Sequence, residues 1–192
     1  MFNGELVLPQ NKRLDATMSA LSLWLEPEPI AAAAMSANIN QLATRLGAQT
    51  FAPHITVIGG FQAEENAAIE QAGQFAKEFQ ALDVTFETFG FEDVIVRAAY
   101  LKALATHELN QLRARAGELF DFPSDEYLPH MSLLYSATVL ENDRRSAVNE
   151  LGLRLPLSVH FEAITLWRTE FDPLKPDFAN WSRIMRVPLK SR

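Results

Sequence analysis

The chain has 192 residues, enough for one domain with a substantial core and too few for two domains of ordinary size. Its 13 Phe, 3 Trp and 3 Tyr exclude the composition of a disordered chain. It has 17 basic and 24 acidic residues, a net charge of −7, and no cluster of Lys or Arg. Binding to an extended nucleic acid is therefore not expected, whereas a small anionic ligand held by a local site remains open.

The chain has no cysteine, which excludes disulfides, thiolate metal sites and a cysteine nucleophile. Residues 1–17 contain charged side chains and no sustained apolar stretch, so no signal peptide is expected. Uncharged stretches elsewhere are interrupted by Pro, Gly, Asn and Gln, so no membrane span is expected. These features predict a soluble cytoplasmic protein, which we expect to be a monomer.

Residues 1–18 show little periodicity and are expected to form an N-terminal extension ahead of one domain at 19–192. From Leu21 onward, apolar periodicity predicts strand 21–25, helix 35–46, strand 54–58, helix 69–79, strand 84–89, strand 94–101, helix 106–119, strand 130–135, helix 141–151, strand 157–169 and strand 181–189. The order β-α-β-α-β thus occurs twice and a terminal strand follows, which predicts an α+β fold.

Individual residues mark several of these boundaries. Pro27 and Pro29 are expected to end the first strand, and the pair Gly59-Gly60 to close the second. Gly47 is a plausible stop for the first helix, and Thr106 a fair N-cap for the third.

A short motif occurs once in each half. Pro53-His54-Ile55-Thr56-Val57-Ile58 matches Pro129-His130-Met131-Ser132-Leu133-Leu134 position by position. A strand ending at Leu25 precedes the first histidine, and a strand ending at Leu101 precedes the second by the same spacing along the sequence. One histidine followed two residues later by a hydroxyl is common by chance. Two copies at equivalent places indicate a duplicated β-α-β-α-β unit.

These motifs have the side chains needed for acid–base chemistry on a phosphoester. Residues i and i+2 of a strand share a face, so His54 lies beside Thr56, and His130 beside Ser132. If the halves pack about a pseudo-two-fold axis, two imidazoles and two hydroxyls converge. With an ordinary pKa near ~6.5, one imidazole can accept a proton while the other donates one. The hydroxyls can donate hydrogen bonds to the non-bridging phosphate oxygens.

Two other uses of the histidines are weaker. Each could simply begin a buried strand and bond to backbone, although the duplication argues against this. A metal site would need further ligands, and the sequence has no HExxH pattern, no third histidine at ligand spacing and no carboxylate near either motif within the strand. No metal or cofactor is therefore expected, and His107 and His160 are expected to be ordinary surface residues.

The two motifs resemble those of the 2H phosphoesterase superfamily. Ser22-Leu23-Trp24-Leu25-Glu26-Pro27 and Pro129-His130-Met131-Ser132-Leu133-Leu134-Tyr135 further resemble its cyclic phosphodiesterase branch, found in plants and yeast. The resemblance covers about residues 20–190 and is specific only around these segments. It implies a bilobal fold, with two pseudo-symmetric lobes around a central water-filled cleft, and metal-independent hydrolysis.

The resemblance also implies a substrate and roles. The branch opens ADP-ribose 1″,2″-cyclic phosphate and nucleoside 2′,3′-cyclic phosphates to the 1″- or 2′-phosphate. His54 and His130 would be acid and base, in an order left open, and Thr56 and Ser132 would hold the phosphate. Tyr135 falls at the position of a substrate-contacting tyrosine and Trp24 at that of a cleft tryptophan. For both aromatics, packing in the core is an equal alternative.

Three alternatives remain. The 2′-5′ RNA ligase-like branch shares the histidine motifs, so an RNA-end activity is the nearest one, although the net charge of −7 argues against long RNA. A second alternative is a nucleotide-binding module without turnover. In a third alternative, the repeat of the motif is a coincidence and the two histidines have only a structural role. The preferred prediction is a cyclic phosphodiesterase acting on a small nucleotide-like phosphodiester.

Overall fold

The computed structural model describes residues 18–123, 126–170, 172 and 176–191. Apart from Met18, the predicted N-terminal extension lies outside these residues. The elements are β1 (Met18–Pro27), α1 (Pro29–Leu46), β2 (Ile55–Glu64), α2 (Glu65–Ala76), β3 (Leu82–Phe91), η1 (Ile95–Arg97), β4 (Ala99–Ala103), α3 (His107–Leu119), β5 (His130–Leu134), α4 (Glu141–Glu150), β6 (Leu157–Arg168), η2 (Phe178–Asn180) and β7 (Ser182–Pro188). The predicted α+β class and the doubled β-α-β-α-β order are confirmed.

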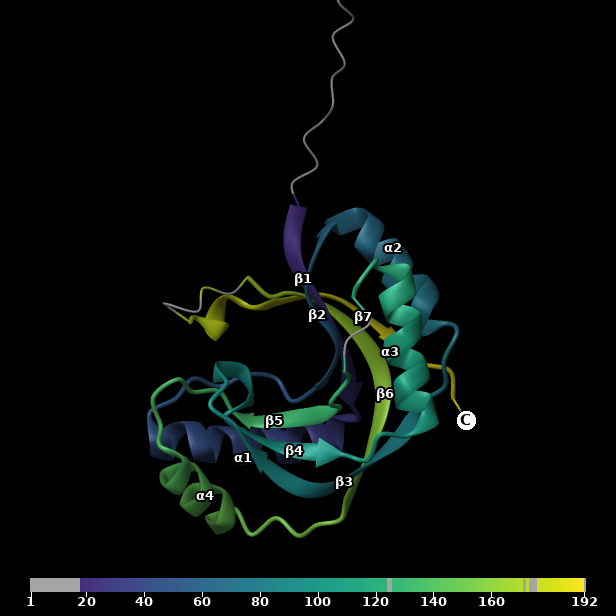
Figure 1. Ribbon diagram of the computed structural model, residues 1–192. Helices are drawn as coiled ribbons and strands as arrows, with labels where there is room; N and C mark the ends of the chain where they lie inside the picture. The colour runs from purple at the N-terminus through teal and green to yellow at the C-terminus, as the bar shows by residue number, and fades with distance from the viewer. Residues whose placement is uncertain (1–17, 124–125, 171, 173–175, 192) are drawn as a thin grey trace, which may run out of the picture.

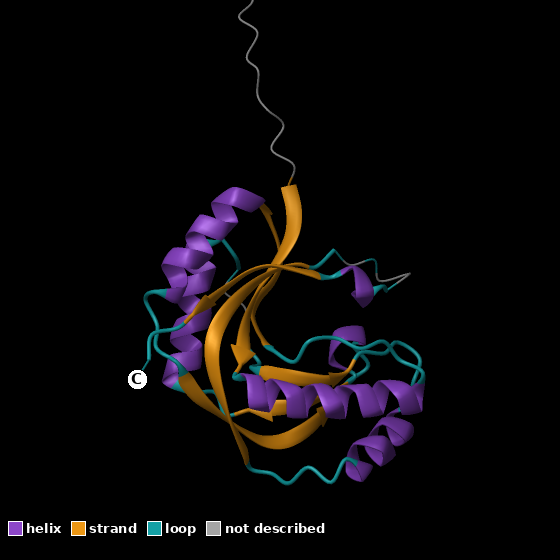
Figure 2. Ribbon diagram, turned by 180° about the vertical axis from the view of Figure 1, so that it is seen from behind, coloured by secondary structure: helices purple, strands orange, loops and turns teal. Residues whose placement is uncertain are grey.

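The strands form one antiparallel sheet that closes on itself. Their order is β1-β2-β5-β4-β3-β6-β7, and β1 also pairs with β6, so that six strands make a ring and β7 lies beside β6. Figure 1 shows the helices outside this ring, with α2 and α3 together on one side and α1 and α4 on the other. Each helix pair combines one helix from each half of the sequence, and the same arrangement is visible from behind in Figure 2.

Strand periodicity separates the core from the opposite face of the sheet. Leu21, Leu23 and Leu25 of β1 are fully buried in the core, while Trp24 lies on the other face. In β5, Met131 belongs to the core, and His130 lies on the opposite phase. The alternation predicted for the first strand is thus confirmed, and the two histidine motifs begin strands whose apolar residues anchor them in the core.

Local boundaries agree with the sequence at two positions. Gly47 ends α1 in the left-handed conformation, with a φ of 64° that favours glycine. The Thr106 hydroxyl accepts a hydrogen bond from the Leu109 amide and caps α3. Helix α1 begins at Pro29, a position where the missing amide proton of proline costs nothing.

The prediction that Gly59-Gly60 closes the second strand is wrong. Strand β2 continues to Glu64, and the register passes from Ser22 opposite Gly59 to Leu21 opposite Phe61. Gly60 is therefore the extra residue of a β-bulge, and its φ of 74° is a conformation that glycine adopts without steric cost. The apolar pattern alone could not distinguish a bulge from a turn.

The prediction of a continuous strand at 94–101 is also wrong. The segment contains the short helix η1, and β4 begins only at Ala99. The buried Arg144 of α4, far away in the sequence, donates hydrogen bonds to the carbonyl oxygens of Glu92 and Ala98, on either side of η1. The short helix η2 was not predicted either.

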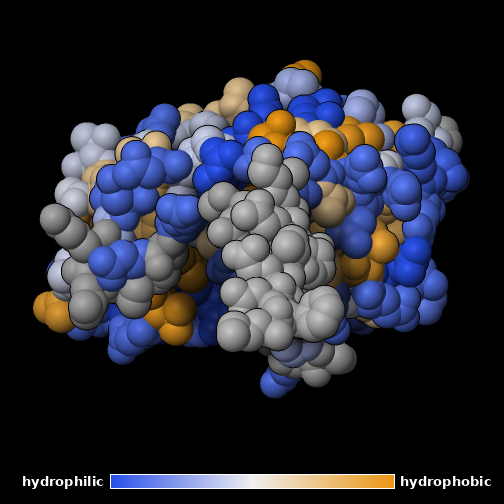
Figure 3. Space-filling view, turned by 90° about the horizontal axis from the view of Figure 1, so that it is seen from above, coloured by the Kyte–Doolittle hydropathy of each residue, from blue (hydrophilic) through white to orange (hydrophobic). Residues whose placement is uncertain are grey.

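The described surface gives no sign of membrane insertion through helices. No helix in the described ranges is long and apolar enough to cross a membrane. On the face seen in Figure 3, hydrophilic residues predominate and apolar residues gather only in small patches.

Candidate functional site

The ring of strands brings the two histidine motifs together. Strands β2 and β5 pair in antiparallel orientation with Ile55 opposite Met131, the residue after the histidine in each motif. His54 and His130 therefore lie on neighbouring strands. They are close enough for charge to act between them, because a charge on His130 lowers the pKa of His54.

Both imidazoles are held by the same local contact. The Nδ1 of His54 lies 2.6 Å from the Ala52 carbonyl oxygen, and the Nδ1 of His130 lies 2.8 Å from the Leu128 carbonyl oxygen. Because a carbonyl can only accept, each Nδ1 carries the hydrogen and donates it. Each ring is thus oriented by the bond from its Nδ1 to the carbonyl two residues earlier in the chain. The Nε2 of each ring is left to exchange a proton.

His54 lies in an aromatic environment. It is 5% exposed, its ring stacks on Trp24 with centroids 3.5 Å apart and planes at 6°, and the ring of Phe51 approaches edge-on at 6.5 Å. Burial lowers the pKa of His54 to about 3, although the bond to the Ala52 carbonyl opposes the shift. The imidazole is therefore neutral at ordinary pH and has a lone pair that can accept a proton.

His130 lies in a more polar environment. It is half-buried, and the ring of Tyr100 meets it edge-on with centroids 5.2 Å apart. Burial is the main cause that lowers the pKa of His130, and the positive charge of Arg97 acts in the same direction. The bond to the Leu128 carbonyl and the negative charge of Glu92 raise the pKa.

Tyr100 is a site residue that the sequence reasoning missed. It follows Trp24 by the same spacing that separates His54 from His130. Trp24 lies opposite Thr56 in the β1–β2 ladder, and Tyr100 lies opposite Ser132 in the β4–β5 ladder. The duplication therefore places an aromatic ring against each histidine, and the constant spacing between the two halves was the signal that could have found the second ring.

A carboxylate holds the hydroxyl of Tyr100, and a glycine leaves room for its ring. Its hydroxyl donates to Glu92 Oε1 at 2.6 Å, and the other oxygen of Glu92 accepts from Arg97 Nε at 2.8 Å. Burial and the Glu92 carboxylate raise the pKa of Tyr100 to about 12. A Cβ at Gly90, opposite Tyr100 on β3, would lie 2.1 Å from the ring carbon Cζ, so only glycine leaves room for the ring.

The two hydroxyls of the motifs differ. Ser132 is buried, and its Oγ donates to the Val96 carbonyl at 2.8 Å, so its one proton is engaged. Thr56 is half-buried, and its hydroxyl makes no hydrogen bond with the part of the chain that the structure describes. The Thr56 carbonyl accepts from the Tyr127 hydroxyl at 3.2 Å. Thr56 can thus donate to a ligand directly, whereas Ser132 must first rotate.

The aromatics Trp24 and Tyr135 are buried. Trp24, 3% exposed, stacks on Trp167 as well as on His54, with centroids 4.5 Å apart. Tyr135, 5% exposed, stacks on Phe51 with centroids 3.6 Å apart, and burial raises the pKa of its hydroxyl. Both residues therefore offer little free ring surface, and they support the aromatic walls around His54.

A cavity of about 370 Å³ opens beside His54. It is lined by Trp24, Ser36, Asn40, Thr50, Phe51, Ala52, Trp167, Phe178, Ala179 and Trp181. Four of its five aromatic residues were missed by the sequence reasoning. They lie outside the duplicated motifs, and their convergence depends on contacts over a long sequence separation.

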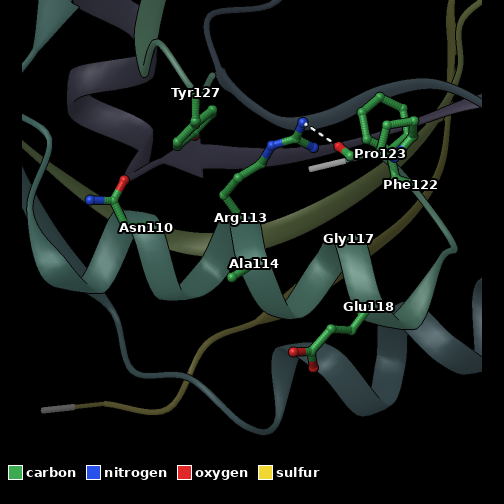
Figure 4. Close-up of a pocket in the computed structure, with 8 residues that line it drawn as sticks. All are labelled: Asn110, Arg113, Ala114, Gly117, Glu118, Phe122, Pro123 and Tyr127. Carbon is green, nitrogen blue, oxygen red and sulfur yellow. Dashed lines mark hydrogen bonds between the residues drawn. The ribbon is translucent and has the colours of Figure 1, made fainter. Parts of the chain in front are cut away.

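A second cavity, of about 560 Å³, lies beside α3 and contains no residue of either motif. Figure 4 shows Arg113 extending from α3 toward the segment at Phe122 and Pro123. Its guanidinium donates to the Pro123 carbonyl at 3.2 Å and lies over the ring of Phe122 at 4.7 Å. The first cavity, rather than this one, adjoins His54.

The remaining histidines lie outside the site. His107 is exposed at the start of α3, and the Nδ1 of His160 lies 2.7 Å from an Asp83 carboxylate oxygen. Across the described residues, no group of three or more His, Asp or Glu side chains is arranged to hold a metal ion.

The fold and the sequence agree on one family. A family model of the 2′-5′ RNA ligase superfamily matches residues 23–173, so the chain belongs to this superfamily. Among curated proteins, none matches the sequence. The broader expectation of a 2H phosphoesterase is thereby confirmed at the level of the superfamily, and the plant and yeast branch stays a prediction.

Solved structures with the same fold include nucleotide complexes. E. coli LigT complexed with NADP+ has a TM-score of 0.59 and 16% identity over 90% of this chain and 99% of that one. TT0787 of Thermus thermophilus has a TM-score of 0.59 and 16% identity over 90% and 98%. A structure described as a phosphoesterase has a TM-score of 0.57 and 18% identity over 90% and 99%. LigT is also solved with ATP and with 3′-AMP. At such identities the likeness shows the fold alone.

Proposed function

We propose that this protein hydrolyses small cyclic phosphodiesters to phosphomonoesters by paired-histidine acid–base catalysis that needs no metal. The substrate class is a nucleoside 2′,3′-cyclic phosphate or ADP-ribose 1″,2″-cyclic phosphate. One observation carries the proposal: His54 and His130 lie on neighbouring strands, and each uses Nδ1 to bond a carbonyl two residues back. Each Nε2 is thereby left to exchange a proton, and proton transfer on both sides of a phosphorus atom requires two such atoms.

The reaction balances with these two groups alone. Nε2 of one imidazole takes a proton from water as the water oxygen forms a bond to phosphorus. The ring P–O bond breaks, and the leaving oxygen takes a proton from Nε2 of the other imidazole. Each positioned proton transfer is typically worth ~10²–10⁴-fold in rate. Strain in a five-membered cyclic phosphate lowers the remaining barrier.

Hydroxyls and aromatic rings supply the binding part of the proposal. Thr56 would donate to a non-bridging phosphate oxygen, and Ser132 would join it after turning away from the Val96 carbonyl. The cavity beside His54 would take the base or ribose, because its aromatic walls suit a flat ring. Trp24 would line that cavity, and Tyr135 would support it through the stacked ring of Phe51.

The test is turnover in the presence of EDTA. Purified protein should open a 2′,3′-cyclic nucleotide or ADP-ribose 1″,2″-cyclic phosphate, and His54→Ala and His130→Ala should each lower kcat at least ~10²-fold, because each removes one proton transfer. His107→Ala removes an exposed histidine outside the site and should keep wild-type activity. Full activity in either motif variant would overturn the proposal.

A second candidate is an RNA-end phosphodiesterase, which the match to the 2′-5′ RNA ligase superfamily favours. The net charge of −7 favours the small substrate, since a bound RNA backbone usually needs basic residues along its path. Rates on a cyclic mononucleotide, an oligonucleotide with a cyclic phosphate end and a 2′-5′-linked dinucleotide separate the two. Tight mononucleotide binding without any product would instead indicate a binding module.

A further inference from the structure

The two histidines have similar backbone contacts but different neighbours. His54 is packed between the face of Trp24 and the edge of Phe51, and no acidic side chain in the described residues acts on its charge. His130 is more exposed, and a carboxylate, that of Glu92, acts on it. The pseudo-symmetry of the fold therefore does not extend to the electrostatics of the site.

The polar side chains beside His130 form a hydrogen-bonded cluster. Glu92 Oε1 accepts from the Tyr100 hydroxyl at 2.6 Å, and Oε2 accepts from Arg97 Nε at 2.8 Å and Nη2 at 2.5 Å. The Tyr100 ring in turn lies edge-on against His130. The buried Arg144 donates to the Glu92 carbonyl, which ties this segment to α4. Glu92 is thus held on both carboxylate oxygens and through its backbone.

We propose that Glu92, fixed by Tyr100 and Arg97, is a positioning residue that makes His130 the proton donor of the reaction and leaves His54 as the proton acceptor. This assignment rests on the proposed function. It decides which histidine is the acid and which is the base, a question that the two motifs leave open. His54 and His130 touch the reacting atoms, whereas Glu92 acts only through the charge and orientation of His130.

Burial and charge together favour the first proton on His130 rather than on His54. A protonated imidazole at His130 is attracted by the Glu92 carboxylate, which offsets part of the repulsion from the Arg97 guanidinium, whereas at the more deeply buried His54 no carboxylate of the described residues opposes the effect of burial. The other titratable groups near His130 are Tyr100, Lys102 opposite it in the β4–β5 ladder, and His54 beside the paired strand β2. Once His130 is charged, it disfavours a second charge on His54.

This order matches the protonation state that forms between the two titrations. Between the two titrations His54 is neutral and His130 is charged, which is the state that can accept a proton from water and donate one to the leaving oxygen. With the opposite roles, only a small fraction of molecules would have the required protonation. After turnover His54 holds the proton from water, His130 has lost one, and exchange with solvent restores both.

The test uses two isosteric or near-isosteric changes of opposite sign. Glu92→Gln removes the attraction for charged His130 and should lower its pKa, while Arg97→Gln removes the repulsion and should raise it. The alkaline limb of the pH profile of kcat/KM should therefore move to lower pH in Glu92→Gln and to higher pH in Arg97→Gln, each by roughly 0.3–1 pH unit. The exposed Glu70→Gln and Arg154→Gln make the same charge changes elsewhere and should leave the profile in place.

Imidazole titration by NMR separates this inference from the proposed function. Opposite shifts of the His130 pKa in the two variants support the inference even if no cyclic phosphate is turned over, in which case only the proposed function fails. The inference is overturned if the His130 pKa moves in neither variant or in the same direction in both. It is also overturned if the acid limb of the rate profile moves instead, because His130 would then have to be neutral.

Discussion

His54 is a titratable side chain that folding removes almost completely from water. Its pKa falls to about 3 in the folded chain, mainly through burial, from an ordinary value near ~6.5. Trp24 supplies much of that burial through its stacked ring. The same contact that packs the His54 imidazole therefore makes the stability of the protein depend on pH.

The sign of this dependence follows from proton binding. Below pH ~6.5 the unfolded chain protonates His54 while the folded chain does not, so stability is present above pH ~6.5 and is lost as the pH falls toward about 3. Between pH 6.5 and 5 the free energy of unfolding should fall by about 1 kcal/mol per pH unit through this group.

Urea unfolding across this range measures the effect. His54→Gln should show a shallower decline of the free energy of unfolding than wild type, whereas His107→Gln, at an exposed position, should keep the wild-type slope. Equal slopes in wild type and His54→Gln would contradict the prediction.

The β3–β4 ladder connects the position of His130 to the packing of a glycine. Gly90 lies opposite Tyr100, and the ring of Tyr100 occupies the space where a side chain at Gly90 would begin. Tyr100 in turn contacts His130 and bonds to Glu92. One small residue in β3 thus allows the aromatic wall on β4.

Gly90→Ala should displace the Tyr100 ring, because the new Cβ would overlap it at 2.1 Å. The free energy of unfolding should fall by about 1–3 kcal/mol, as overpacking usually costs. Gly73→Ala on α2 is the matched control. Its Cβ meets nothing within 4 Å, and a helical alanine should leave stability equal or raise it by ~0.5–1 kcal/mol. Denaturant unfolding decides this, and a Gly90→Ala variant as stable as wild type would contradict the overlap.

At the scale of the whole molecule, net charge bears on the size of the proposed substrate. The chain has 17 basic and 24 acidic residues, and several of the arginines are paired with carboxylates, as Arg115 is with Glu78 and Arg186 with Glu26. The acidic excess and these ion pairs both weaken the attraction of a nucleic-acid backbone to the protein.

The rate should therefore depend only weakly on salt. Between 50 and 200 mM NaCl we expect kcat/KM for a cyclic mononucleotide to change by less than about threefold, because no row of phosphate contacts is lost. A protein that bound 6–10 phosphates would lose roughly 10³–10⁵-fold in affinity over the same range. Steady-state kinetics at several salt concentrations measure this. A steep fall on an oligonucleotide substrate, with a higher rate than on the mononucleotide, would favour the RNA-end candidate.

Patterns that are local or repeated along the chain could be predicted from the sequence. The alternation at Leu21, Leu23 and Leu25 predicted β1, and the repeat of the His54 motif at His130 predicted the duplicated fold and two adjacent motifs. Such features depend on side-chain periods of 2 and 3.6, and on residue identity at fixed spacing, which are present before any tertiary contact forms.

Tertiary structure alone decided how the two histidines differ. Arg144 bonds to the segment before β4, Glu92 and Arg97 meet beside His130, and the face of Trp24 stacks on His54. Several of these contacts join residues that are far apart in the sequence. Burial and charge at a site depend on every element packed against it. The sequence by itself therefore determined that two equivalent histidines exist, while the folded ring of strands makes one of them buried and neutral and gives the other a carboxylate.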